Sequence, residues 1–296
     1  MVQLDERTIA IPGDDSEPLD ERLDAGIPAW LIQTRAGGMC YRQLGEEGAP
    51  PIVLLHAVPL SSLSWVSVLP HLARRGLRVY ALDLPGSGGT PPAPQPLSVQ
   101  GYADALAAFV DALGLERFGL IGHASHAAAA LRYTVDHADR VARLVLSKLP
   151  YVDEAGKQRM GRATATWYHP DGSPAMPPIE NWNPRPQVTE QRFRVMTMRM
   201  NFDMYRAGPR SAEGHHALAT YDFLPDLAAL AVPLRFVWAS GDHFMAHRDL
   251  IVNAAAHLRP SIRIVEGATS WPMYERPRGW AEAAGEFFSA AERPTG

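Results

Sequence analysis

The sequence has almost no cysteine and no long apolar run. Cys40 is the single cysteine among 296 residues, so no disulfide can form within the chain. No apolar stretch is long enough to cross a bilayer. The first residues, MVQLDERTIA, lack the basic start and apolar stretch of a secretory signal. We therefore expect a protein of the reducing cytoplasm that does not enter a membrane.

The chain also lacks an excess of either charge. It has 28 Lys plus Arg against 32 Asp plus Glu, a net charge of -4. This balance argues against nucleic acid or an anionic membrane surface as a main partner. Hydrophobic residues make up 46% of the chain, which is an ordinary globular composition. The length suits one large domain, or a core with an inserted cap, with ample room for a buried core.

Short apolar runs alternate with amphipathic ones along most of the chain. The apolar runs predict strands, and the amphipathic runs have the spacing of helices that bury one face. This alternation predicts an α/β protein with a doubly wound, mostly parallel sheet and helices on both faces. The expected strands are 51–55, 77–82, 118–121, 142–146, 234–238 and 262–266, and the expected helices include 61–75, 102–113, 127–135, 249–258 and 278–291.

The alternation breaks between residues 150 and 225, which are rich in Pro, Met, Trp and Arg and contain no clear strand. We expect a helical cap there, inserted into an α/β core formed by residues 29–149 and 226–296. Such a cap would cover the carboxyl ends of the strands, where open α/β sheets bind ligands. Residues 1–28 are acidic, and we expect them to form a solvated N-terminal arm rather than a partner-binding one.

The expected strand at 118–121 leads through Gly122-His123-Ala124-Ser125-His126-Ala127 into a helix. This is the strand–turn–helix setting of a nucleophile elbow. Together with other blocks it resembles the α/β-hydrolase superfamily, especially its capped branch of epoxide hydrolases, haloalkane dehalogenases and C–C or ester hydrolases. The resemblance implies the α/β-hydrolase fold with an inserted cap. The other blocks are Leu54-Leu55-His56-Ala57-Val58-Pro59, Asp83-Leu84-Pro85-Gly86-Ser87-Gly88, Phe236-Val237-Trp238-Ala239-Ser240-Gly241-Asp242 and Gly267-Ala268-Thr269-Ser270-Trp271-Pro272.

The resemblance also assigns three residues to the catalytic positions of the family. Ala124 stands at the nucleophile position, Ser270 at the histidine position, and Asp242 keeps the acid. A methyl group cannot attack a carbonyl or an epoxide. Covalent triad chemistry needs a nucleophile, a base and an acid. The sequence therefore predicts a degenerate catalytic triad and no ordinary serine-hydrolase chemistry.

Three catalytic candidates remain, each with a structural alternative. Asp242 is a candidate general base or substrate anchor, unless backbone N–H groups or His243 hold it. His126 is a candidate general base or acid if it faces the pocket, unless it packs under the cap or bonds a carbonyl. Ser125 is a relocated nucleophile or, more simply, an oxyanion-hole donor through its backbone N–H. The candidate substrate-binding residues are Ala124, Val58, Ala57, Ser270, Trp271 and Trp167.

The leading hypothesis is a repurposed, non-hydrolytic enzyme of the lyase, isomerase or cyclase type. It would use acid–base chemistry on a largely apolar small molecule, without a cofactor and without a metal, since His215 and His216 lack ligand spacing. One alternative is a catalytically silent small-molecule-binding protein. Another is an atypical hydrolase that uses Ser125 or an activated water. The sequence leaves open whether the protein forms a homo-oligomer.

Overall fold

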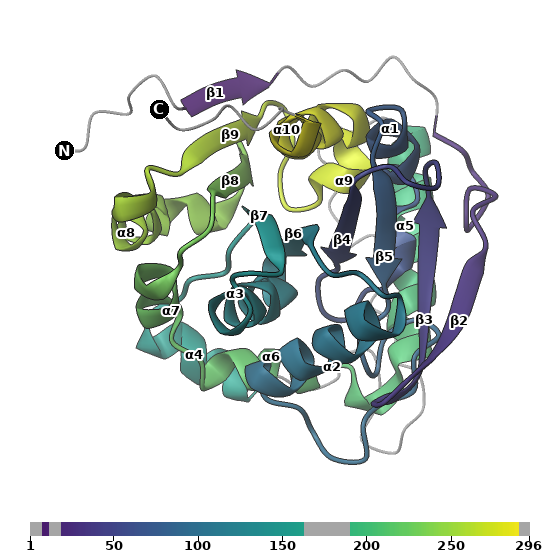
Figure 1. Ribbon diagram of the computed structural model, residues 1–296, viewed down its shortest axis with the longest axis horizontal. Helices are drawn as coiled ribbons and strands as arrows, with labels where there is room; N and C mark the ends of the chain where they lie inside the picture. Colours follow the sequence, from purple (N-terminus) through teal and green to yellow (C-terminus); the bar gives the residue numbers. More distant parts are fainter. Residues whose placement is uncertain (1–7, 12–18, 163–189, 290–296) are drawn as a thin grey trace.

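The computed structural model describes residues 8–11, 19–162 and 190–289 (Figure 1). At its centre the described chain forms a nine-stranded sheet with the order β1-β9-β8-β7-β6-β4-β5-β3-β2. The strands are β1 (Thr8–Ile11), β2 (Ala29–Thr34), β3 (Gly37–Leu44), β4 (Pro51–Leu55), β5 (Arg78–Leu82), β6 (Phe118–His123), β7 (Val141–Ser147), β8 (Leu234–Ala239) and β9 (Ser261–Val265).

The sheet is parallel except at one edge. β2 pairs antiparallel with β3, and β3 pairs antiparallel with β5, whereas every other neighbouring pair is parallel. The predicted α/β class with a mostly parallel sheet is confirmed. In such a sheet the carboxyl ends of the parallel strands meet at a single edge, so the loops after β4, β6, β7, β8 and β9 lie near one another.

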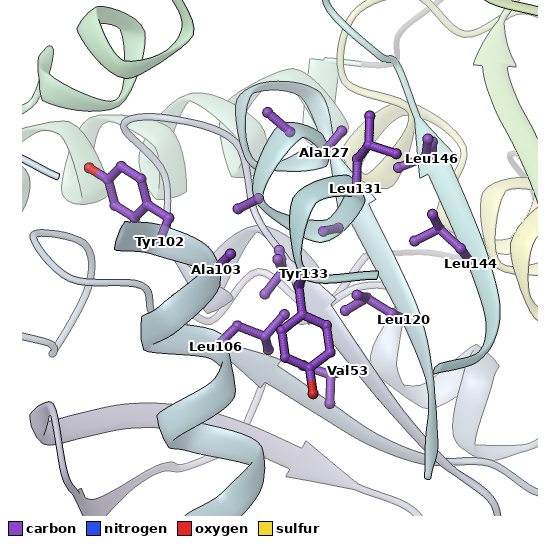
Figure 2. Close-up of a cluster of buried hydrophobic side chains, with 14 of the residues drawn as sticks. Val53, Tyr102, Ala103, Leu106, Leu120, Ala127, Leu131, Tyr133, Leu144 and Leu146 are labelled. Atoms are coloured by element: carbon purple, nitrogen blue, oxygen red, sulfur yellow. The ribbon is translucent and has the colours of Figure 1, made fainter. Parts of the chain in front are cut away.

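Helices cover both faces of the sheet, and the alternation of side chains along the strands explains why. In β4, Val53 and Leu55 join one buried cluster, while Ile52 and Leu54 join the other. Successive side chains of a strand point to opposite faces, so a strand that is apolar throughout needs a cover on both sides. Figure 2 shows the first cluster between the sheet and two helices. These helices are α2 (Val99–Ala112) and α3 (Ala127–Asp136), joined on that side by α7 (Phe223–Ala229) and α8 (Arg248–Ala254), while α1 (Leu69–Ala73), α9 (Pro272–Glu275) and α10 (Pro277–Ser289) cover the other face.

A helical insertion separates β7 from β8, as the sequence predicts. Its described part contains α4 (Glu154–Gly161), α5 (Glu190–Ala207) and α6 (Glu213–Ala219). α6 contacts the turn after β6, and α5 contacts the loop that follows β4. The insertion therefore lies against the carboxyl-terminal edge of the sheet. The domain limits at 150 and 225 stay a prediction, and Trp167 lies outside the described residues.

The described parts of the N-terminal segment contact the body of the protein, while a solvated arm over residues 1–28 stays a prediction. Thr8–Ile11 forms β1 and adds a parallel strand next to β9 at the edge of the sheet. Further along, the buried guanidinium of Arg199 in α5 donates to the carbonyl oxygens of Asp20, Arg22 and Leu23. A buried cation requires such acceptors, and an edge strand offers unpaired backbone groups, so these two features hold the described parts of the segment against the body of the protein. In the described ranges no helix is long and apolar enough to span a membrane.

Candidate active site

The turn after β6 has the geometry of a nucleophile elbow, and Ala124 stands at its apex. β6 ends at His123, a short 3-10 turn spans Ala124–His126, and α3 begins at the next residue. Ala124 has φ +47°, in the left-handed region that side chains other than glycine rarely adopt. Such a strained strand-to-helix turn lifts its central side chain above the sheet. The predicted placement of Ala124 is confirmed.

Glycine is required just before this turn. A Cβ added to Gly122 would lie 2.6 Å from the Cβ of Ala130 and 2.7 Å from the Cα of Ala127. Both of those residues belong to α3, so the missing side chain lets the helix fold back closely onto the strand. This close approach brings the N-terminus of α3 up to the end of β6.

Asp242 lies shortly after β8 and begins the 3-10 turn His243–His247. Its Oδ1 accepts a hydrogen bond from the backbone N–H of Phe244 at 2.9 Å. Its side chain is only 1% exposed, yet its Oδ2 is buried and accepts no hydrogen bond from the described residues. Burial raises the pKa of Asp242, while the positive charge of Lys148 opposes that shift. Asp242 is therefore a buried carboxylate in which one oxygen accepts no hydrogen bond from the described residues.

Lys148, which the sequence reasoning missed, is central to this part of the structure. It directly follows β7, and its side chain is largely buried. Its Nζ donates to the backbone carbonyl of Ser270 at 3.2 Å and lies 5.0 Å from the ring centroid of Trp271. On the other side Nζ lies 5.6 Å from the ring of Phe244, whose N–H binds Asp242. Lys148 therefore connects the loop after β8 with the loop after β9.

The sequence carried one signal for Lys148. The chain has only two lysines, Lys148 and Lys157, and all its other basic residues apart from histidine are arginines. Lysine is rarely buried unless it is paired or has a specific role. A rare lysine immediately after a mostly apolar strand was therefore a candidate site residue.

His126 makes the carbonyl contact that the sequence reasoning named as its structural alternative. Its Nδ1 donates to the backbone oxygen of His56 at 2.8 Å, which joins the elbow to the loop after β4. Its Nε2 is buried and has no partner among the described residues. Burial, the largest cause, and the neighbouring His56 lower the pKa of His126 well below its usual range. An acid–base role for His126 stays a prediction.

Ser125 is not joined to either neighbouring histidine. His123 Nδ1 bonds the Ser147 hydroxyl at 3.0 Å, and His126 Nδ1 bonds the His56 carbonyl. The Nε2 atoms of His123 and His126 have no hydrogen-bond partner in the described part of the chain. The pair of nucleophile and base that a relocated nucleophile needs is therefore not formed in this conformation.

The structure divides the predicted site residues between two groups, with the elbow between them. Asp242, Ser270 and Trp271 gather around Lys148. Val58 and His126 instead line a cavity of about 20 Å³ together with Gly214 of α6. Ala57, buried beside Val58, accepts a hydrogen bond from the His56 ring. Within residues 8–11, 19–162 and 190–289, no cluster of three or more His, Cys, Asp or Glu side chains is arranged to hold a metal.

Comparison with known proteins agrees with this architecture. The chain is 32% identical to Epoxide hydrolase A of Mycobacterium tuberculosis over 127 residues, which are 42% of this chain and 39% of that protein. It is 39% identical to a non-heme haloperoxidase of Rhodococcus erythropolis over 97 residues, which are 32% of this chain and 35% of that protein. The alignments thus span well under half the length of these relatives.

Solved structures match over far more of the chain. E-2-(acetamidomethylene)succinate hydrolase superposes with a TM-score of 0.72 at 16% identity, covering 89% of this chain and 100% of that one. A thermophilic esterase from Thermogutta terrifontis gives 0.70 at 21% identity, covering 88% and 98%. At such identities the likeness shows the fold alone. Residues 50–270 also match the alpha/beta hydrolase fold family, and the chain belongs to that family.

Proposed function

We propose that this protein is a non-hydrolytic acid–base enzyme of the lyase, isomerase or cyclase type, with Asp242 as its general base. One observation carries the proposal: Asp242 Oδ2 is buried and accepts no hydrogen bond from the described residues. In a catalytic triad the carboxylate of the acid accepts a hydrogen bond from the histidine. Here Ser270 would stand at the position of that histidine, so Oδ2 has no imidazole partner and could accept a proton from the substrate.

The absence of a nucleophile supports the same reaction class. Ala124 at the apex of the elbow offers a methyl group, so no covalent intermediate forms there. The backbone N–H groups of Ser125 and Val58 do not depend on their side chains and can still polarise a substrate oxygen. His126 holds these two segments together through the His56 carbonyl. Trp271 and the apolar neighbours of the elbow suit a largely apolar small molecule, and the roles of Ala57 and Trp167 stay predictions.

The pKa of Asp242 sets the expected pH dependence. Burial raises this pKa, which makes the ionised carboxylate a stronger base than an exposed aspartate. The base must be ionised to accept a proton. Turnover should therefore rise with pH through the pKa of Asp242 and then level off. Lys148 and His243 oppose the shift, and Glu275 adds to it.

Replacing Asp242 by Asn tests the proposal. Asparagine caps a helical turn as well as aspartate does, so the bond from the Phe244 N–H is retained while the base is lost. The assay follows by NMR how fast the α-protons of a panel of aryl ketones exchange for deuterium in D2O. We expect this rate to fall roughly a hundredfold or more in the variant.

Asp222→Asn is the matched control for this experiment. Asp222 caps α7 by the same kind of bond, from the Leu224 N–H at 3.1 Å, but it is exposed and is not among the residues gathered around Lys148. An exchange rate of Asp242→Asn equal to that of the wild type would refute the role of Asp242 as general base. Binding without turnover in every variant would favour the silent binding protein, and Ser125-dependent hydrolysis would favour the atypical hydrolase.

A further inference from the structure

The surroundings of Lys148 define the state of its amino group. Nζ donates to the Ser270 carbonyl and lies over the rings of Trp271 and Phe244. A carbonyl oxygen and two aromatic faces all attract a cation more strongly than they attract a neutral amine. These contacts favour the ammonium form of Lys148, and a protonated amine cannot attack a carbonyl carbon.

The charge of Lys148 reaches both sides of the site. It lowers the pKa of Asp242 on the loop after β8, and it lowers that of His123, the neighbour of Ala124. Phe244 bridges the pair physically, because its N–H binds Asp242 Oδ1 while its ring lies below Nζ. The resting site therefore places one positive and one negative side chain in a largely buried setting.

Charge balance decides what this pair does during a proton transfer. When Asp242 accepts a proton it becomes neutral, and Lys148 then loses the attraction of that carboxylate in a largely buried place, which is unfavourable. An anion that forms on the substrate in the same step replaces the lost attraction. The ammonium thus stabilises the transition state, where that anion develops, more than it stabilises the ground state.

We propose that Lys148 is the electrophilic partner of Asp242, and that the substrate is a carbonyl compound with an acidic C–H next to its carbonyl group. This inference rests on the proposed function and names its substrate class. The carboxylate of Asp242 takes the proton, the C–H electron pair forms a C=C bond, and the carbonyl π electrons move to the oxygen beside the ammonium. The enolate then accepts a proton at another carbon or expels a leaving group, so that no oxidant or reductant is needed.

4-Nitrophenol is a suitable probe, because its delocalised phenolate resembles an enolate and its visible absorption reports ionisation. We expect Lys148→Met to weaken binding of the phenolate about tenfold or more, the scale of a charge-assisted hydrogen bond. Lys148→Arg keeps the charge and should retain most of the affinity. Asp242→Asn removes the competing negative charge and should strengthen phenolate binding.

Lys157→Met is the matched control, since it removes the only other lysine, which lies half-buried in α4. It should bind 4-nitrophenolate as the wild type does. In the α-proton exchange assay, Lys148→Met should lose roughly a hundredfold in rate, with partial rescue in Lys148→Arg.

Two results would overturn the inference. One is phenolate binding by Lys148→Met equal to that of the wild type. The other is borohydride trapping of a carbonyl compound on Lys148, which would show a nucleophilic amine. By contrast, Lys148-dependent phenolate binding together with normal proton exchange in Asp242→Asn would overturn Asp242 as the base and would leave Lys148 as an anion-binding residue.

Discussion

Asp203 in α5 accepts two hydrogen bonds from Ser61, one from its backbone N–H at 2.9 Å and one from its hydroxyl at 2.5 Å. The carboxylate thus fastens the inserted helix to the loop that follows β4. Asp83 binds the next backbone N–H, that of Ser62, at 2.7 Å. Two acidic side chains therefore hold adjacent residues of one buried loop, and their proximity has a consequence for stability.

The first prediction concerns stability against pH. Burial, and to a lesser degree Asp83, raise the pKa of Asp203 from 3.8 to about 7. Between those two values the folded state binds more protons than the unfolded state, so this residue's contribution to stability falls as pH rises from about 4 to 7. Across this interval the fall is on the order of a few kcal/mol in the free energy of unfolding, and Asp203→Asn should remove it. Urea unfolding midpoints measured at intervals between pH 4 and 8 check this, and parallel wild-type and variant curves would contradict it.

The second prediction concerns the bond between His126 and His56. His126→Phe removes the Nδ1 donor and leaves the buried His56 carbonyl without it. The free energy of unfolding should fall by about 1–3 kcal/mol. His126→Asn provides the control, because its side-chain amide nitrogen can occupy the place of Nδ1 and should recover part of the loss. Guanidinium unfolding of the three proteins measures the difference, and equal losses in both variants would speak against the bond.

A third prediction addresses the proposed loss of the nucleophile and the histidine. The wild type should resist labelling by a fluorophosphonate probe, because Ala124 has no oxygen. The double variant Ala124→Ser/Ser270→His should gain labelling and hydrolyse 4-nitrophenyl acetate roughly a hundredfold faster than the wild type. The open Oδ2 of Asp242 would orient the introduced imidazole.

The single variants serve as controls for this restoration, since each supplies only half of the nucleophile and base pair. Both should stay close to the wild-type rate of ester hydrolysis. Stoichiometric labelling of the wild type that disappears in Ser125→Ala would instead show Ser125 to be the nucleophile.

The fourth prediction tests the close packing behind the elbow. Gly122→Ala forces a Cβ into the space between β6 and α3, where Ala130 would be 2.6 Å away. Thermal unfolding should show a loss of about 1–3 kcal/mol, the usual range for overpacking a core. Gly161→Ala in α4 adds the same methyl group at an ordinary 3.4 Å contact with Ala219 and should cost little. Similar melting temperatures for both variants would contradict the packing argument.

The local sequence was sufficient to place the elbow, because strand and helix periodicities are short-range properties. β4 is predicted as 51–55 and observed as Pro51–Leu55, and the helix predicted from 127 begins there. The positive φ of Ala124 follows from the same local pattern of a strand that must turn at once into a helix. Likewise the order of strands and helices along the chain indicates a parallel sheet, whose topology then brings particular loops to one edge.

The tertiary structure alone decided which side chains those loops bring together. Lys148, Asp242 and Ser270 come from three loops, and the reach of Nζ to the Ser270 carbonyl depends on how β7, β8 and β9 lie side by side. Whether His126 faces a substrate or a carbonyl depends on the position of the loop after β4, which lies 70 residues earlier. Side-chain partners of this kind are set by long-range packing, whereas the periodicity of a sequence records only which face of each element is buried.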